Sequence, residues 1–191
     1  FVGIFAILLP RVVPTRRMAI AFACASACVL GLSANTAYEV YAFERDDVGN
    51  FDALLRAMPR GKRLVHLNLE PRSTHVNSHV FAYFGSYYRA RYGGVASYSF
   101  SETSHWPVQY RPETRPPSRM TWANACSYRN ERDGEYFDYV LVHGERDPIA
   151  AMPPGPRWEL IGASRLWRLY RKSTTEPPVP PGDSPDRGPC G

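Results

Sequence analysis

The side chains best suited to acid–base chemistry are two glutamates and a histidine that stand at the ends of predicted strands. Glu70 and Glu102 each follow a predicted strand, and His143 ends a third. Ligands gather at the carboxyl ends of strands in open parallel sheets, so these three are the catalytic candidates. Two carboxylates along one rim would also meet the requirement of a glycosidase. The alternative for each is an ordinary surface or core residue.

Two further histidines have the spacing of a helical metal pair. His75 and His79 lie four residues apart, and a zinc site would need Glu70 or His66 as a third ligand. No HExxH motif surrounds the pair, which favours solvent-facing loop histidines, and we expect no metal and no cofactor. His66 lies inside a predicted strand and is expected to be a core or edge histidine rather than a base.

The sequence contains none of the short motifs that mark common enzyme sites. GxxxxGK[ST], GxGxxG, GxSxG and CxxC are all missing. The net charge is +5, but the arginines are scattered and no basic run of five occurs, so nucleic acid is not an expected partner. Cys126 and Cys190 would share a compartment, and an oxidising one would permit a disulfide between them.

The strongest signal in the chain is the uncharged segment Met18–Ala37. Twenty helical residues at about 1.5 Å each span the hydrocarbon core of a bilayer, roughly 30 Å thick. Arg16 and Arg17 precede the segment, as the positive-inside rule expects of a cytoplasmic end. The lipid bilayer is therefore the first expected partner, with the soluble domain on the outer, periplasmic face of the inner membrane.

Other membrane helices are a second expected class of partner. Small residues recur every fourth position of the segment and would let another helix approach closely; they are Ala19, Ala23, Ala27 and Gly31. Plain alanine richness explains the same pattern. A very apolar soluble helix and a cleaved signal peptide are alternatives to the membrane crossing. Phe1–Leu9 is a second apolar run, too short to span, and indicates the end of an earlier membrane helix.

The polar remainder predicts an α/β domain with a mostly parallel sheet, because helices and strands alternate along it. Helices are expected over Phe51–Met58 and Ser78–Tyr92. A hairpin is expected from Arg157–Ile161 and Arg165–Arg171, with Gly162–Ser164 as its turn. The other predicted strands are Arg63–Leu69, Val95–Phe100 and Tyr136–Val142.

The domain boundaries follow from these patterns. Residues 1–17 would be the end of a truncated membrane helix and a cytoplasmic loop, and 18–40 the transmembrane helix. Residues 41–172 would form the extracytoplasmic domain. A disordered, Pro-rich tail would occupy 173–191.

Several of these segments resemble a known family. They are FDALLxxMPxGKR (Phe51–Arg63), YYxARYGG (Tyr87–Gly94), FDYVLV (Phe137–Val142) and WRLYR (Trp167–Arg171), all after a membrane helix. Together they resemble the C-terminal extracytoplasmic domain of bacterial polytopic GT-C glycosyltransferases, of the protein mannosyltransferase and lipid A aminoarabinose transferase kind. The resemblance covers roughly residues 1 to 172. The segments that carry it reflect the order of helices and strands and contain no catalytic residue of the family.

The resemblance implies a membrane glycosyltransferase that uses a lipid-linked sugar donor and a glycan acceptor. In that family the catalytic acidic residue lies in the first extracytoplasmic loop, so no catalytic residue is carried onto this chain. Two alternatives stay open. One is a binding or docking module without transferase activity, and the other is an anchored hydrolase working through Glu70, Glu102 or His143.

Overall fold

The computed structural model describes residues 15–76, 79–97, 107, 111, 113, 125–149, 155–175 and 177–178. The chain divides into two compact units, Phe1–Tyr41 and Ala42–Gly191. Most of residues 101–119 and most of the predicted Pro-rich tail lie outside the described residues.

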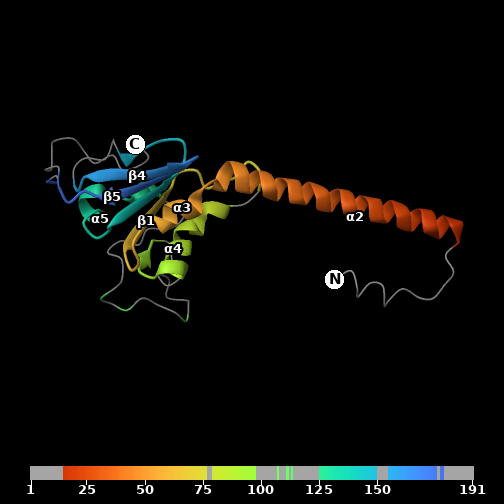
Figure 1. Cartoon of the computed structure of the whole chain (residues 1–191), viewed down its shortest axis with the longest axis horizontal. Coiled ribbons are helices and arrows are strands. Elements are labelled where there is room, and N and C mark those ends of the chain that lie inside the picture. The colour runs from red at the N-terminus through yellow and green to blue at the C-terminus, as the bar shows by residue number, and fades with distance from the viewer. Residues whose placement is uncertain are drawn as a thin grey trace. The chain divides into compact units, whose positions relative to one another are not determined.

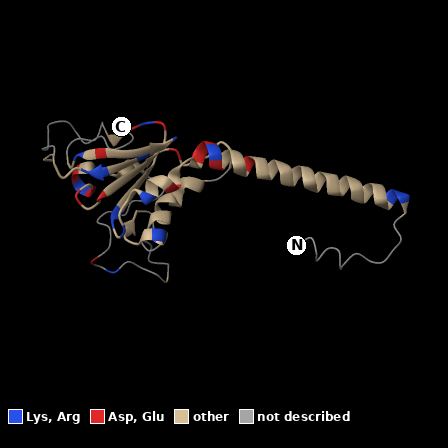
Figure 2. Ribbon diagram, viewed as in Figure 1, with Lys and Arg blue, Asp and Glu red and all other residues tan. Residues whose placement is uncertain are grey.

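The first unit consists, where it is described, of one long helix. This helix, α2 (Arg16–Phe43), has charged residues near its two ends and none between Met18 and Ala37 (Figure 2). The stretch Arg16–Val48 is long and apolar enough to cross a membrane, and none of its apolar window is buried. A single helix of this kind near the N-terminus agrees with the membrane segment predicted from the sequence.

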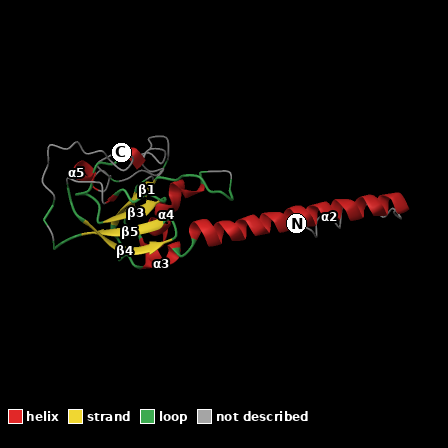
Figure 3. Ribbon diagram, turned by 90° about the horizontal axis from the view of Figure 1, so that it is seen from above, coloured by secondary structure: helices red, strands yellow, loops and turns green. Residues whose placement is uncertain are grey.

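The second unit is an α/β domain built on a five-stranded sheet (Figure 1). The strand order is β2-β1-β3-β5-β4, and Figure 3 shows β5 between β3 and β4. The strands are β1 (Arg63–Asn68), β2 (Val95–Ala96), β3 (Tyr139–His143), β4 (Trp158–Ser164) and β5 (Trp167–Lys172).

The prediction of a mostly parallel sheet is wrong. β1 pairs in parallel with both β2 and β3, but β3 pairs antiparallel with β5, and β5 antiparallel with β4. The hairpin of β4 and β5 is present as predicted, and two of the four strand pairings are antiparallel. The reason is burial: Trp167, Leu169 and Tyr170 of β5 are apolar and buried, whereas no residue of β4 is buried. β5 therefore pairs with β3 inside the sheet and β4 takes the edge.

The hairpin turn also differs from the prediction. Gly162, Ala163 and Ser164 belong to β4, and the chain turns at Arg165–Leu166 instead. Arg165 adopts a φ of 54°, in the left-handed region. Gly162 lies at a register shift in β4, where an added Cβ would come within 2.7 Å of Cδ2 of Leu54. The glycine thus serves a β-bulge and the close approach of α3 rather than a turn.

Two helices cover one face of the sheet. They are α3 (Phe51–Arg56) and α4 (Phe84–Tyr92), the latter preceded by a 3₁₀ turn over Val80–Tyr83. Their apolar side chains form one core with the strands; its members include Phe51, Leu55, Phe81, Tyr88, Leu64, Leu141 and Leu169. The helices predicted over Phe51–Met58 and Ser78–Tyr92 are confirmed where the chain is described. The first helix ends earlier than predicted, and the second begins later.

A second core covers the opposite face of the sheet. There Val65, Val140 and Tyr170 pack against Tyr128 and Phe137 from the segment that precedes β3. This segment contains a 3₁₀ turn, Ala125–Ser127, and a short helix, α5 (Asn130–Asp133). The central strands are therefore buried on both faces, which explains why β1 and β3 read as continuous apolar runs.

Candidate functional site

The carboxyl ends of β1 and β3 lie side by side, and they bring two of the predicted site residues together. Asn68 stands opposite His143 in the parallel ladder, and the Leu69 backbone N–H donates to the His143 carbonyl at 2.9 Å. Glu70 follows directly and reaches the turn after β3. Glu102, the third candidate, lies outside the described residues.

Glu70 uses its carboxylate to hold that turn. Its Oε1 accepts a hydrogen bond of 2.9 Å from the Glu145 backbone N–H. The turn passes through Gly144, whose φ of 144° favours glycine, and an added Cβ there would come within 3.2 Å of Leu69. A half-buried carboxylate that satisfies a backbone donor is a structural group in this arrangement.

His143 is enclosed in the core on the helical side of the sheet. Its ring lies 4.0 Å from the ring of Phe81 and 4.3 Å from that of Trp167, measured between centroids. Its Nδ1 lies 3.2 Å from Oδ1 of Asn68. Burial lowers the pKa of His143 to about 4, which the Glu70 backbone opposes in part. The imidazole is neutral near pH 7, and its burial keeps it from any substrate in solution.

His66 is a core histidine, as its place in a strand predicts. It is fully buried, and burial together with the nearby His143 lowers its pKa to about 3. Its backbone N–H donates to Oγ of Ser97 at 2.8 Å. α4 approaches it closely, because a Cβ added to Gly85 would lie 2.9 Å from that of His66. The two histidines form a neutral pair inside the apolar core.

The two histidines that have the spacing of a metal pair, His75 and His79, have different surroundings. His75 Nε2 lies 3.6 Å from Oδ2 of Asp46, while His79 is exposed before the 3₁₀ turn. No group of three His, Cys, Asp or Glu side chains able to hold an ion occurs among the described residues.

Sequence reasoning missed Asp47, which follows α2 in the chain and contacts this edge of the sheet. It lies in a π-helical turn, Glu44–Val48, and is buried. Its carbonyl accepts a hydrogen bond from Nε1 of Trp167, and its carboxylate accepts one from the Ser73 hydroxyl. Asp47 stands in an acidic run after an apolar helix, where the pattern indicates solvent exposure, so no sequence signal marks its burial.

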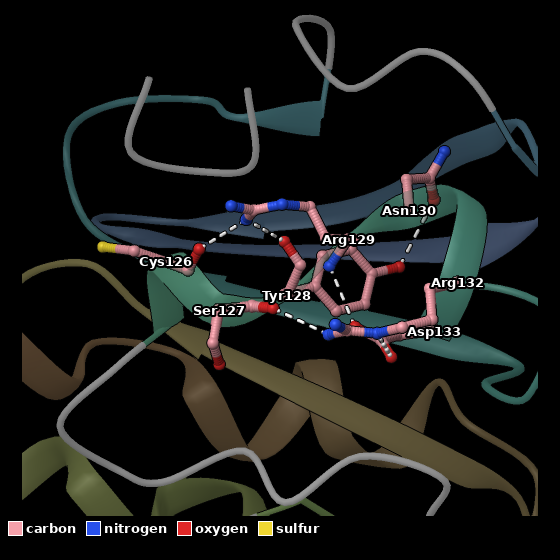
Figure 4. Close-up of polar contacts among 7 residues, drawn as sticks. All are labelled: Cys126, Ser127, Tyr128, Arg129, Asn130, Arg132 and Asp133. Carbon is pink, nitrogen blue, oxygen red and sulfur yellow. Dashed lines mark hydrogen bonds and ion pairs between the residues drawn. The ribbon is translucent and has the colours of Figure 1, made fainter. Parts of the chain in front are cut away.

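A second polar cluster lies around α5 on the other face (Figure 4). The buried Asp133 accepts hydrogen bonds from the Arg129 backbone N–H at 2.9 Å and from the Arg132 guanidinium at 2.8 Å. Arg129 donates in turn to the Cys126 carbonyl at 2.6 Å. Oδ1 of Asn130 accepts from Nε1 of Trp158 at 2.7 Å. These contacts fix a short helix that could not stand alone, and we assign the cluster a structural role.

Cys126, in the same segment, is disulfide-bonded, whereas Cys24 and Cys28 in α2 are free. Cys190, the partner that the sequence permits, lies outside the described residues.

No protein-family model matches this chain, and no curated protein or solved structure gives a significant match.

Proposed function

We propose that the chain is a membrane-anchored, extracytoplasmic α/β domain of an integral membrane glycosyltransferase that uses a lipid-linked sugar donor. The domain itself carries no catalytic group in this proposal and helps to shape the acceptor side. The catalytic carboxylate would belong to another part of the enzyme, as in the GT-C proteins that the sequence resembles.

The observation that carries the proposal is α2. None of its apolar window is buried by the described residues of the chain. An exposed apolar helix of this length is unstable in water and stable in a bilayer. The continuous helix runs directly into the folded unit at Ala42, which is buried there.

The disulfide at Cys126 supports an extracytoplasmic location. Disulfides persist in oxidising compartments and are rare in the cytosol. The bond and the paired arginines before α2 support the same orientation by independent arguments.

The geometry of the candidate residues favours a domain that has no catalytic activity of its own over an anchored hydrolase. Glu70 holds a backbone turn and His143 is enclosed by aromatic rings. This same observation favours the docking module as a second candidate function, because a docking surface needs no catalytic group.

A topology reporter tests the location. A reporter enzyme that is active only outside the cytoplasm is fused to the end of the full chain and expressed in bacteria. We expect strong activity, and a matched reporter that works only in the cytoplasm should stay silent. The reverse pattern would overturn the extracytoplasmic proposal.

Photolabelling separates the transferase from the docking module. The full chain in vesicles is exposed to a polyprenyl-phosphate sugar that carries a photoreactive group. The transferase proposal predicts labelling that excess unlabelled polyprenyl-phosphate sugar removes. Labelling no stronger than with a photoreactive phosphatidylcholine would favour the docking module.

A further inference from the structure

Two imidazoles and an amide line the helical face of the sheet at the carboxyl ends of β1 and β3. Side chains alternate along a strand, so His66 and Asn68 of β1 face the same side. His143 of β3 stands opposite Asn68 in the ladder and shares that side. All three side chains are buried. We call His66 and His143 the histidine pair.

The hydrogen bond of His143 fixes where an added proton would go. Its Nδ1 lies 3.2 Å from Oδ1 of Asn68, so we assign the hydrogen of the neutral ring to Nδ1. A second proton would then bind to Nε2, which is buried and has no hydrogen-bond partner among the described residues. A charged ring would therefore lie in the closed core without an acceptor for its new N–H.

The aromatic rings around His143 cannot replace that acceptor. The rings of Phe81 and Trp167 lie 4.0 and 4.3 Å from the imidazole, measured between centroids. A cation beside an aromatic ring gains less than the cost of taking an unpaired charge out of water. Protonation consequently requires that water reach the ring, and for this a covering element has to move.

The charged groups on the surrounding elements have other partners. The acidic pairs are Glu70 with the Glu145 backbone N–H, Asp47 with the Ser73 hydroxyl, and Asp52 with Arg56 and Arg91. The cations of α4 lie in its last turn, beyond Gly85. The contacts to the pair from the 3₁₀ turn, α4 and β5 come from uncharged residues, which are Phe81, Gly85 and Trp167. No described carboxylate is therefore placed to compensate a charge on His143.

The 3₁₀ turn and the start of α4 are the part of the fold that can give way. α4 lies directly on the pair, because a Cβ added to Gly85 would come within 2.9 Å of the Cβ of His66. The strands beneath are fixed more firmly: β1 and β3 each have a partner on both sides, and the second core covers their other face.

The two ends of this cover are attached in different ways. At the C-terminal end, the Tyr88 hydroxyl donates to the Pro59 carbonyl and accepts from the Lys62 backbone N–H at 3.0 Å. At the N-terminal end, the Phe81 ring packs edge-on against Trp167 with 5.9 Å between centroids. The C-terminal end of α4 is thus anchored by hydrogen bonds, and we expect opening to begin at Phe81.

We propose that residues 80–87 form an acid-released cover over the carboxyl ends of β1 and β3, and that protonation of the histidine pair releases it. In the closed form Asn68 and His143 are sealed in the core. In the open form they face water at the strand ends. The device belongs to the α/β unit and does not depend on the transferase proposal.

The pKa values of the pair agree with this coupling. Burial lowers the pKa of His143 to about 4, and burial together with His143 lowers the pKa of His66 to about 3. A hydrated histidine titrates near pH 6.5, so the open form binds more protons than the closed form as the pH falls below that value. From pH 7 to pH 5 the opening equilibrium should rise roughly 25-fold for each histidine, or about 500-fold for both.

Hydrogen–deuterium exchange of the full chain in detergent micelles tests the cover. Exchange rates at pH 7 and pH 5 are divided by those of unstructured peptides at the same pH, which gives protection factors. We expect protection of residues 80–87 to fall about 500-fold and, at pH 5, to be at least roughly tenfold below that of residues 139–143. Low urea should speed exchange less in 80–87 than in 139–143, because local opening exposes less surface.

Matched variants identify the groups responsible. His143→Gln should reduce the pH effect on residues 80–87 from about 500-fold to about 25-fold. His79→Gln alters an exposed histidine just before the 3₁₀ turn and should keep the full effect. If the His143→Gln variant does not fold, the comparison of the two segments in the unaltered chain still decides.

Two results would overturn the proposal. Equal protection of residues 80–87 and 139–143 at both pH values would mean that water reaches the histidines only when the whole unit unfolds. Protection of 80–87 that is the same at pH 7 and pH 5 would mean that the histidine pair does not control the cover. Neither result bears on the membrane location or on the lipid-linked donor, which the topology reporter and the photolabelling test separately.

Discussion

The indole of Trp167 donates a hydrogen bond of 3.0 Å to the carbonyl of Asp47, across 120 residues of sequence. Trp167 is fully buried and begins β5, whereas Asp47 lies in the π-helical turn that follows α2. The bond satisfies the backbone carbonyl of Asp47 in the π-helical turn that follows the α-helix. It joins the start of the α/β unit to its last strand.

Trp167→Phe should destabilise the α/β unit. The substitution leaves the Asp47 carbonyl without its donor and opens space between Phe51 and Phe84, whose rings lie 4.6 and 5.2 Å from that of Trp167. We expect the free energy of unfolding to fall by about 2 kcal/mol, from chemical denaturation in detergent micelles. Tyr87→Phe alters an exposed ring and should stay within about 0.5 kcal/mol of the parent. If the two variants lowered the free energy of unfolding equally, the hydrogen bond from Trp167 to Asp47 would not contribute to stability.

Acidic pH should weaken the domain through its two core histidines. Folding lowers the pKa of His66 to about 3 and of His143 to about 4, below the usual 6.5. Below pH 6.5 the unfolded chain therefore binds more protons than the folded chain. The contribution of the two neutral histidines to the stability of the folded state is lost as the pH falls. Between pH 6.5 and 4.5 each histidine should remove about 1.4 kcal/mol per pH unit from the free energy of unfolding.

Denaturant titrations at several pH values measure this slope. His143→Gln keeps a polar side chain without a titrating ring and should remove about half of it. His79→Gln, at an exposed histidine, should leave the slope unchanged. A slope that His143→Gln does not reduce would mean that this histidine is not buried in the neutral form.

The adjacent glycines after α4 should differ sharply when replaced by alanine. Gly93 has a φ of 73° with open space around its Cβ position, so Gly93→Ala should cost about 1 kcal/mol from backbone strain alone. At Gly94 the φ is 83°, and an added Cβ would also lie 2.2 Å from the Lys62 carbonyl oxygen. Gly94→Ala should cost about 3 kcal/mol or more. Similar melting temperatures for the two variants would contradict this close approach of α4 to β1.

The disulfide predicts a difference in reactivity among the cysteines. Under denaturing conditions without reductant, Cys24 and Cys28 should react fully with a maleimide and Cys126 should not. Reductant should make Cys126 reactive and lower the stability of the unit by about 2–4 kcal/mol. Peptide mass spectrometry reads the labelling at each position. A reactive Cys126 in unreduced protein from the cell envelope would remove one support for the extracytoplasmic location.

The sequence predicted the elements well and their assembly less well. An uncharged run of residues located α2, and apolar periodicity located α3, α4 and the strands, because each of these signals is local in the sequence. The antiparallel position of β5 depends instead on which hairpin strand is more apolar, and on its fit between β3 and β4. Gly162 was misread for a related reason: the need for a glycine there comes from Leu54, which is distant in sequence.

The same distinction applies to the site. Glu70 and His143 were expected at one edge, and they are there because parallel strands end together. The enclosure of His143 was not predictable, since Phe81 and Trp167 come from other elements. The burial of Asp47 was not predictable either, because its partners Trp167 and Ser73 also come from other parts of the sequence.

The position of β5 has a consequence for how the protein is made. β5 is the last strand among the described residues, yet it lies between β3 and β4, and Trp167 packs in the middle of the first core. The sheet cannot close until residue 172 has emerged from the ribosome. On the topology proposed above, the domain would therefore still be open when α2 enters the bilayer, and an open chain is the form that a translocation channel can carry.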